Sequence, residues 1–130
     1  MPTPCTYDYA IVRVVPRVER GEFVNAGVIL SSAERSYLRS RIELDEARLG
    51  ALDSTLDLVA IRDALAAIPR ICAGGDAAGA LGRLTLRERF HWLVAPRSSA
   101  IQTSAVLSGR CDDLDATLER LLVTMVRAPR

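Results

Sequence analysis

A small set of polar side chains lies inside or beside apolar runs of the sequence. Its members are Arg13, Glu22, Asn25, Arg97, Ser98 and Gln102. Buried polar groups have to be hydrogen-bonded, so two interpretations stay open. In the first, which we favour, the set is an internal network that fixes strand register. In the second, it lines a small cleft suited to an anionic or peptide-like ligand.

Residues suited to catalysis or metal binding are sparse. The single histidine, His91, excludes any site that needs two or three imidazoles, and no local signature around it indicates a nucleophile pair. Gly74 and Gly79 have the spacing of a phosphate loop, but Ala80 and Leu81 stand where Lys and Ser or Thr belong. We therefore assign no catalytic residue, no metal ligand and no cofactor, and we favour a non-enzymatic role.

The charge balance gives little support to nucleic-acid binding. The 17 basic residues are all arginine, but 16 acidic residues leave a net charge of +1. Arg83, Arg87 and Arg89 could contact phosphate, and Trp92 could stack on a base. Such an arginine run is more often a solvated helix face, and a single tryptophan is usually needed in the core. Nucleic-acid binding is therefore the least favoured alternative.

The length and composition are those of one ordinary globular domain, which we assign to residues 1–130. Hydrophobic residues make up 49% of the chain and charged residues 25%. Cys5, Cys72 and Cys111 are odd in number and far apart in sequence, which fits a reducing compartment better than a disulfide framework. No signal peptide and no membrane-spanning run is apparent. We expect a soluble, cytoplasmic protein of bacterial type.

Three segments near the N-terminus have the patterns of β-strands. Residues 7–15 are rich in β-branched and aromatic residues, and Pro16 ends the run. Residues 22–31 are apolar on both faces, which predicts a central strand covered on each side. Residues 36–44 alternate, with Leu38, Ile42 and Leu44 inward, so this strand should have one wet face.

The central strand contains one feature that needs an explanation. Asn25 and Gly27 interrupt the apolar run FVNAGVIL. We expect them to mark a place where the strand bends or where another backbone approaches closely. We also expect the Asn25 amide to bond the segment around Arg97 to Gln102.

The remainder of the chain is mostly helical in pattern. We predict a short helix capped by Asp45, a helix from 58 to 72 capped by Ser54 or Thr55 and ended or kinked at Pro69, and a mobile glycine-rich loop over 74–82. A helix over 86–94 with a Thr85/Glu88 capping box, a strand over 99–107 ended by Gly109, and a last helix follow. The last helix should be capped by Asp112 or Asp113, with Leu114, Leu118, Leu121, Leu122 and Met125 on one stripe.

This order of elements predicts one α+β domain. Its sheet should be mainly antiparallel, with about four strands in the chain order β-β-β-α-α-β-α and helices packed on it.

Two blocks of the sequence resemble the DUF3037 family of bacterial proteins of unknown function. The first is YDYAIVRVVPRVERGEFVNAGVIL and the second is RFHWLVAPRSSAIQTSAVLSGRCDD. A Pro-Val-His run that is frequent in the family is replaced here by Ala105, Val106 and Leu107. The resemblance supplies no catalytic residues. Because members are often encoded beside a HipA-like kinase, it implies such a kinase as a protein partner.

These observations favour a protein-interaction or accessory module that binds a HipA-like kinase or associates with itself. The third strand suits this role, because an edge with one wet face can accept another strand. The first alternative is a small ligand-binding domain or enzyme that uses Arg13, Asn25, Arg97 and Gln102. The second alternative is a nucleic-acid binder.

Overall fold

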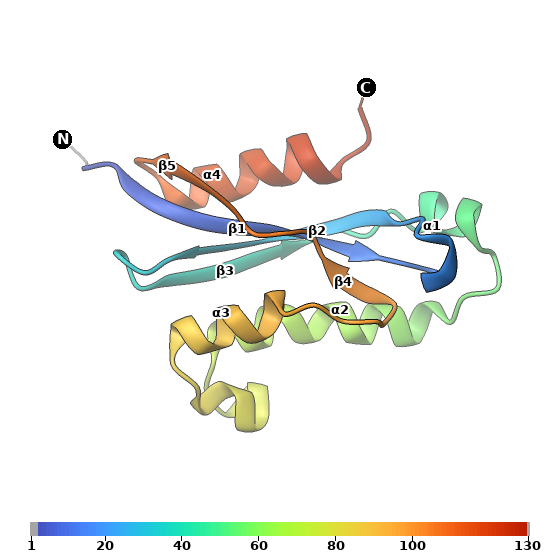
Figure 1. The fold of residues 1–130 in the computed structure, drawn as a ribbon, viewed down its shortest axis with the longest axis horizontal. Coiled ribbons are helices and arrows are strands. Elements are labelled where there is room, and N and C mark those ends of the chain that lie inside the picture. Colours follow the sequence, from blue (N-terminus) through green and yellow to red (C-terminus); the bar gives the residue numbers. More distant parts are fainter. Residues whose placement is uncertain (1–2, 130) are drawn as a thin grey trace.

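The computed structural model describes residues 3–129 and contains one antiparallel sheet with helices on both faces (Figure 1). The sheet has five strands in the spatial order β3-β2-β1-β4, and β5 pairs with β1 on the same side as β4. The strands are β1 (Cys5–Val14), β2 (Val24–Ser32), β3 (Tyr37–Ile42), β4 (Ile101–Thr103) and β5 (Leu107–Cys111). The predicted antiparallel α+β architecture is confirmed, with one strand more than expected.

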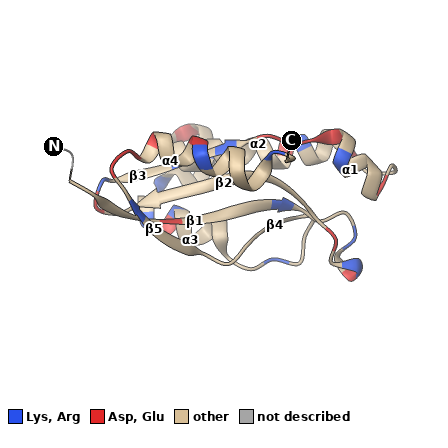
Figure 2. Ribbon diagram, turned by 90° about the horizontal axis from the view of Figure 1, so that it is seen from above, with Lys and Arg blue, Asp and Glu red and all other residues tan. Residues whose placement is uncertain are grey.

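The helices form a layer on each face of the sheet. They are α1 (Glu46–Leu52), α2 (Leu58–Ala73), α3 (Leu86–Val94) and α4 (Leu114–Leu121), with the 3-10 segments η1 (Val18–Arg20) and η2 (Asp76–Arg83). A π-helical turn, η3 (Leu122–Val126), extends α4. Figure 1 shows α4 on one side of the sheet and α2 with α3 on the other, and Figure 2 shows α4 above β2 and β3, with β1, β4 and β5 beside it. None of the helices in residues 3–129 has the length and apolar character that crossing a bilayer requires.

Strand β2 contributes to the hydrophobic cores on both faces. Val24, Ala26 and Ile29 pack with α2 and α3, whereas Val28 and Leu30 pack with α4. This double coverage explains why the strand is apolar throughout, and it confirms the predicted central position.

The polar interruption in β2 is a β-bulge. Val12 pairs with Gly27 but Arg13 pairs with Asn25, so Ala26 is the extra residue on β2. A Cβ on Gly27 would lie 2.6 Å from the carbonyl oxygen of Arg41 on β3. The predicted bend and close backbone approach are both present.

The predicted partner of Asn25 is wrong. Its Nδ2 donates to the carbonyl oxygen of Met125 at 2.8 Å, so the amide binds the C-terminal π-turn instead of the segment from Arg97 to Gln102. The π-turn lies on the α4 face of the sheet, which is the face toward which Asn25 points.

Strand β3 follows its predicted alternation. Leu38 is buried in the core formed with α2, while Arg39 on the other face is exposed. The amphipathic pattern therefore placed both faces of this strand correctly.

Two predictions for the central helices need correction. The side chain of Asp57 caps α2 by accepting from the backbone N–H of Ala60 at 3.1 Å, so neither Ser54 nor Thr55 is the cap. Of the two outcomes expected at Pro69, an end of the helix is wrong, because α2 continues to Ala73. Its last turn is buried against the core and is bonded by Arg89, whose Nη1 donates to the carbonyl oxygens of Ile71 and Cys72.

The N-terminal caps of α3 and α1 were predicted correctly, whereas the structure of the glycine-rich segment before α3 was not. The Thr85/Glu88 capping box is present, and Asp45 caps α1 as expected. The glycine-rich stretch forms the 3-10 segment η2 instead of an irregular loop, with Gly79 at a φ of 61° inside it.

The predicted strand over 99–107 is two strands, β4 and β5, with Gly109 inside the second. Ser104 causes the break, because its Oγ accepts from the backbone N–H of Ile11 at 2.8 Å and takes a place in the ladder that a carbonyl would fill. The registers on the two sides differ by one residue: Val12 pairs with Thr103, and Tyr9 pairs with Leu107.

The last helix begins as predicted and ends differently. Asp113 caps α4 by accepting from the backbone N–H of Ala116 at 3.0 Å. The π-turn adds a residue to the final turn, so Val126 is buried while Met125 is 41% exposed. Met125 therefore does not belong to the buried stripe to which we assigned it.

Candidate functional site

Three of the six predicted site residues form a row across the sheet. Arg13 on β1 lies directly opposite Asn25 on β2 and Gln102 on β4. Residues opposite one another in an antiparallel ladder point to the same face, which here is the α4 face. The structure thus brings together Arg13, Asn25 and Gln102, although they come from three separate segments.

Each member of this row contacts a different neighbour. Asn25 donates to Met125, Gln102 Nε2 donates to the carbonyl oxygen of Ser99 at 2.9 Å, and the Arg13 guanidinium carbon lies 4.2 Å from the ring centroid of Phe23. Arg13 Nε and Asn25 Oδ1 are buried and have no hydrogen-bond partner among the described residues. The row is therefore a set of neighbours, not a closed network of hydrogen bonds.

The other three predicted residues lie elsewhere. Glu22 is exposed and forms an ion pair with Arg20. Ser98 is also exposed. Its neighbour Ser99, and not Ser98, lines the cleft between α2 and β4 that is described below.

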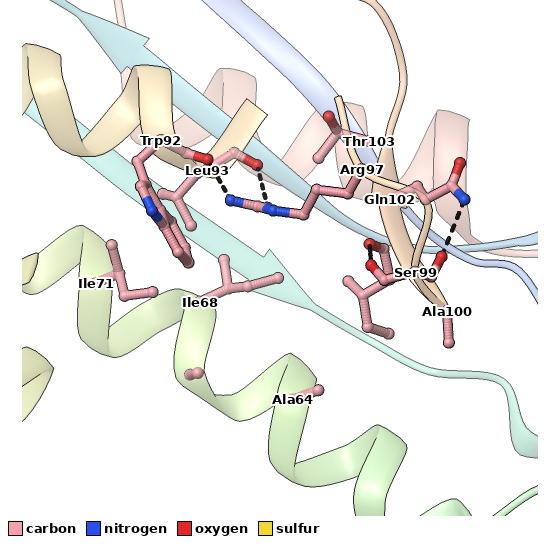
Figure 3. Close-up of a pocket in the computed structure, with 12 residues that line it drawn as sticks. Ala64, Ile68, Ile71, Trp92, Leu93, Arg97, Ser99, Ala100, Gln102 and Thr103 are labelled. Carbon is pink, nitrogen blue, oxygen red and sulfur yellow. Dashed lines mark hydrogen bonds between the residues drawn. The ribbon is translucent and has the colours of Figure 1, made fainter. Parts of the chain in front are cut away.

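Arg97 caps the C-terminal end of α3. Its Nη1 donates to the carbonyl oxygen of Leu93 at 3.2 Å, its Nη2 donates to that of Trp92, and its guanidinium carbon lies 4.2 Å from the Trp92 ring centroid (Figure 3). Helix α3 packs on the face opposite to α4, so Arg97 does not share a pocket with Asn25.

A cleft of about 350 Å³ separates α2 from β4, and we call it the α2–β4 cleft. Apolar side chains of α2 and α3 form most of its wall, and the Trp92 indole forms one side (Figure 3). Its lining residues are Ala64, Ala67, Ile68, Ile71, Trp92, Leu93, Arg97, Ser99, Ala100, Ile101, Gln102 and Thr103. No carboxylate, imidazole or thiol is among them, and the Ser99 and Thr103 hydroxyls donate to backbone carbonyl oxygens. The cleft can therefore hold an apolar group but offers no base that would activate a hydroxyl.

Backbone groups along the outer edge of β3 have no hydrogen-bond partner within residues 3–129. Glu43 N–H donates to the carbonyl oxygen of Ala26 at 2.8 Å, which shows that odd-numbered residues of this segment bond to β2. Backbone groups alternate in direction along a strand, so the N–H and C=O groups of Leu38, Ser40 and Ile42 point away from the sheet. This edge is a template for the addition of another strand.

A groove of about 330 Å³ runs between this edge and the C-terminal half of α2, and we call it the β3 groove. Pro69, Cys72 and Ala73 form its helical wall, and Leu38, Arg39 and Ser40 its strand wall. Burial raises the pKa of the Cys72 thiol to about 11, so the thiol stays protonated near neutral pH and is a poor nucleophile. Ser40 Oγ is buried here with no hydrogen-bond partner among the described residues.

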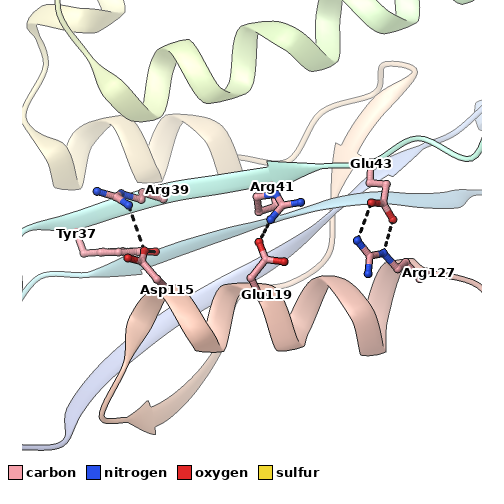
Figure 4. Close-up of polar contacts among 7 residues, drawn as sticks. All are labelled: Tyr37, Arg39, Arg41, Glu43, Asp115, Glu119 and Arg127. Atoms are coloured by element: carbon pink, nitrogen blue, oxygen red, sulfur yellow. Dashed lines mark hydrogen bonds and ion pairs between the residues drawn. The ribbon is translucent and has the colours of Figure 1, made fainter.

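Ion pairs and hydrogen bonds join side chains of β3 to side chains of α4 (Figure 4). Asp115 accepts from Tyr37 Oη at 2.7 Å and from Arg39 Nη1 at 3.2 Å, and Arg41 pairs with Glu119. These side chains are largely exposed, so each contact contributes at most about 1 kcal/mol. Together they hold α4 over one face of β3 and leave its outer edge free.

Sequence reasoning missed these pairs, although a signal was present. Arg39 and Arg41 are two residues apart on a strand, which spans about 6.8 Å. Asp115 and Glu119 are four residues apart on a helix, which spans about 6 Å. Because the distance between the two arginines is close to the distance between the two carboxylates, the spacing predicts that this strand and this helix lie side by side.

The arginines considered for nucleic-acid binding are mostly engaged within the fold. Arg89 bonds the end of α2, and Arg87 Nη1 lies 3.2 Å from a carboxylate oxygen of Asp8. In the part of the chain that the structure describes, no group of three His, Cys, Asp or Glu residues could hold a metal ion.

Comparison with known protein families identifies the family of this chain. The DUF3037 family, described as a protein of unknown function, matches residues 9–126. The chain belongs to the DUF3037 family. No curated protein and no solved structure matches the chain. The match covers nearly all of the two blocks that carried the resemblance, and because the family has no described activity, the function has to be argued from geometry.

Proposed function

We propose that this DUF3037 protein is a non-enzymatic protein-interaction module that accepts an extended segment of a partner along the outer edge of β3. The supporting observation is the unpaired row of backbone groups at Leu38, Ser40 and Ile42 beside the β3 groove. An added strand would gain affinity from these groups and specificity from side chains that enter the groove.

The chemistry of the two cavities supports a binding role over catalysis. The α2–β4 cleft has no titratable group other than Arg97, and that guanidinium is engaged with two carbonyl oxygens and the Trp92 ring. The β3 groove has a thiol whose pKa is raised. Neither cavity pairs a nucleophile with a base, which covalent catalysis requires.

The partner that the family resemblance suggests is a HipA-like kinase, because family members are often encoded beside one. A flexible or terminal segment of such a kinase could pair with β3 without any rearrangement of this fold, because the edge is already formed.

The test uses Ser40→Pro, with Ser40→Ala as the matched control. Proline at position 40 removes an N–H that points outward, so the ladder to β2 stays intact while strand addition is blocked. Alanine keeps that N–H and removes only the hydroxyl. After co-expression with the kinase and size-exclusion chromatography, we expect the wild type and Ser40→Ala to co-elute with the kinase and Ser40→Pro to elute alone at an unchanged melting temperature.

Two results would contradict the proposal. Separate elution of the wild-type chain and the kinase at micromolar concentrations would show that the kinase is not the partner. Retention of the complex by folded Ser40→Pro would show that the partner binds another surface.

A second candidate function is the binding of a small apolar ligand in the α2–β4 cleft. The observation that favours it is Trp92, which is 41% exposed on the wall of an otherwise apolar cavity. Titration with the amphiphilic probe 1-anilinonaphthalene-8-sulfonate, whose aromatic rings bind apolar surfaces, should then quench Trp92 fluorescence, and Ala67→Leu, which narrows the cleft, should weaken the effect. Equal quenching in both proteins would place the probe elsewhere.

A further inference from the structure

Two cysteines that are far apart in sequence lie directly opposite each other in the sheet. Cys5 is the first residue of β1 and Cys111 is the last residue of β5, and the two are register partners. Both thiols are free, and both pack in the hydrophobic cluster beneath α4. Their side chains therefore point to the same face from adjacent strands.

The register fixes the geometry of this pair. Val15 N–H bonds to Ala100 and Ser104 N–H bonds to Ile11, so odd-numbered residues of β1 face the β4–β5 side. Cys5 and Cys111 thus form a hydrogen-bonded pair, for which the Cα atoms are about 5.5 Å apart. This value lies within the range of about 4.4–6.8 Å that a disulfide spans. Because both residues stand at strand ends, the small approach of the Cβ atoms that a bond needs disturbs only one rung of the ladder.

We propose that Cys5 and Cys111 form a reversible thiol–disulfide site whose co-reactant is a small disulfide of the glutathione type. Half-buried Cys111 is the accessible member, while Cys5 is 1% exposed. The Cys111 thiolate attacks one sulfur of the small disulfide, which gives a mixed disulfide and releases one thiol. The Cys5 thiolate then attacks the Cys111 sulfur and expels the second thiol. The protein loses two hydrogen atoms, and the small disulfide is reduced to two thiols that carry them.

The third cysteine is an internal control. Cys72 belongs to the core on the opposite face, formed with α2 and α3. Burial raises the pKa of its thiol, which lowers the thiolate fraction available for exchange. The site is therefore specific to one of the three possible pairings.

The experiment treats the native, folded protein with oxidised glutathione, quenches exchange with acid and maps the products by mass spectrometry. Trypsin cleaves after Arg13, Arg110 and Arg120, so the expected product joins peptide 1–13 to peptide 111–120, with Cys72 free in peptide 71–83. We expect an intact mass lower by two hydrogens, recovery of the starting mass with dithiothreitol, and a melting temperature about 5 °C higher in the oxidised form.

Variants separate this reaction from unspecific oxidation. Cys72→Ser should cross-link as the wild type does, and Cys5→Ala should stop at a glutathione adduct on Cys111. A bridge that includes Cys72, a stable glutathione adduct on wild-type Cys111, or no reaction of the folded protein would each overturn the proposal. The wild-type peptide map decides the matter even if a variant is unstable. The result is independent of whether β3 binds a partner.

Discussion

The side-chain amide of Asn25 and the backbone carbonyl of Met125 are joined by a hydrogen bond of 2.8 Å. The bond links the bulge of β2 to the π-turn that ends α4. Carbonyl groups in the last turn of a helix have no partner within the helix, so Asn25 satisfies one of them. This polar residue is therefore a structural tie between the sheet and the C-terminal helix.

Replacement of Asn25 should destabilise the fold. Asn25→Ala removes the donor and leaves the Met125 carbonyl without a partner, so we expect the free energy of unfolding to fall by about 1–2 kcal/mol. Urea denaturation measures this loss, and an unchanged midpoint for Asn25→Ala would show that the bond has no role in stability.

Gly27 should not tolerate a side chain. Its Cβ position lies 2.6 Å from both the Arg41 carbonyl oxygen and Ile42 Cδ1, so an added methyl group would push β3 away from β2. We expect Gly27→Ala to lower the free energy of unfolding by about 2–3 kcal/mol. Gly50→Ala is the matched control, because Gly50 lies in α1 with nothing within 4 Å and should become more stable by about 0.5–1 kcal/mol. Equal effects of the two changes would contradict the close approach.

Local sequence patterns predicted the elements that depend on neighbouring residues. Alternation located β3, and the T-x-x-E spacing located the start of α3. The failures have long-range causes. The strand over 99–107 is split because Ser104 bonds Ile11, and the turn after Pro69 is bonded by Arg89 from α3. Neither contact has a local signature.

In the candidate site, too, local patterns were predictable and long-range contacts were not. Arg13, Asn25 and Gln102 came together because each lies on a strand whose pattern could be read from the sequence. Arg97 lies in a connection, and its direction is set by the carbonyl groups at the end of α3, so it lines the α2–β4 cleft with Gln102 but does not join Arg13 and Asn25. The edge of β3 was predictable from its alternation, but the groove beside it depends on where α2 packs.

Arg97 should prove to be structural. Arg97→Ala removes the bonds to the end of α3 and uncovers one face of the Trp92 ring, so we expect a loss of about 1–2 kcal/mol in stability. Trp92 is the only tryptophan, and its emission should shift to the red in the folded variant. Arg97→Lys keeps the charge but not the planar fork, so it should resemble alanine. Wild-type stability and emission in Arg97→Ala would instead indicate that the side chain is available to a ligand.

The contact between Glu43 and Arg127 should show a defined pH dependence. Hydrogen bonding by the Arg127 guanidinium, at 2.7 Å, lowers the pKa of the Glu43 carboxyl. A carboxyl whose folded-state pKa is lowered stabilises the fold above its unfolded-state pKa, and this contribution is lost as pH falls through the lowered value. Because both side chains are more than one-third exposed, we expect a double-mutant cycle of Glu43→Gln and Arg127→Ala to give only a small coupling near neutral pH.

The same cycle in acid and in salt tests the origin of that coupling. As the pH falls below the lowered pKa of Glu43, the coupling should shrink, and at about 1 M salt it should shrink near neutral pH as well, because exposed charges are screened. A matched cycle on Arg62 and Glu46, which join α2 to α1, should behave in the same way, since Arg62 lowers the pKa of the Glu46 carboxyl by the same kind of hydrogen bond. A Glu43–Arg127 coupling that persists in acid would mean that these two side chains stabilise the C-terminus by packing and not by charge.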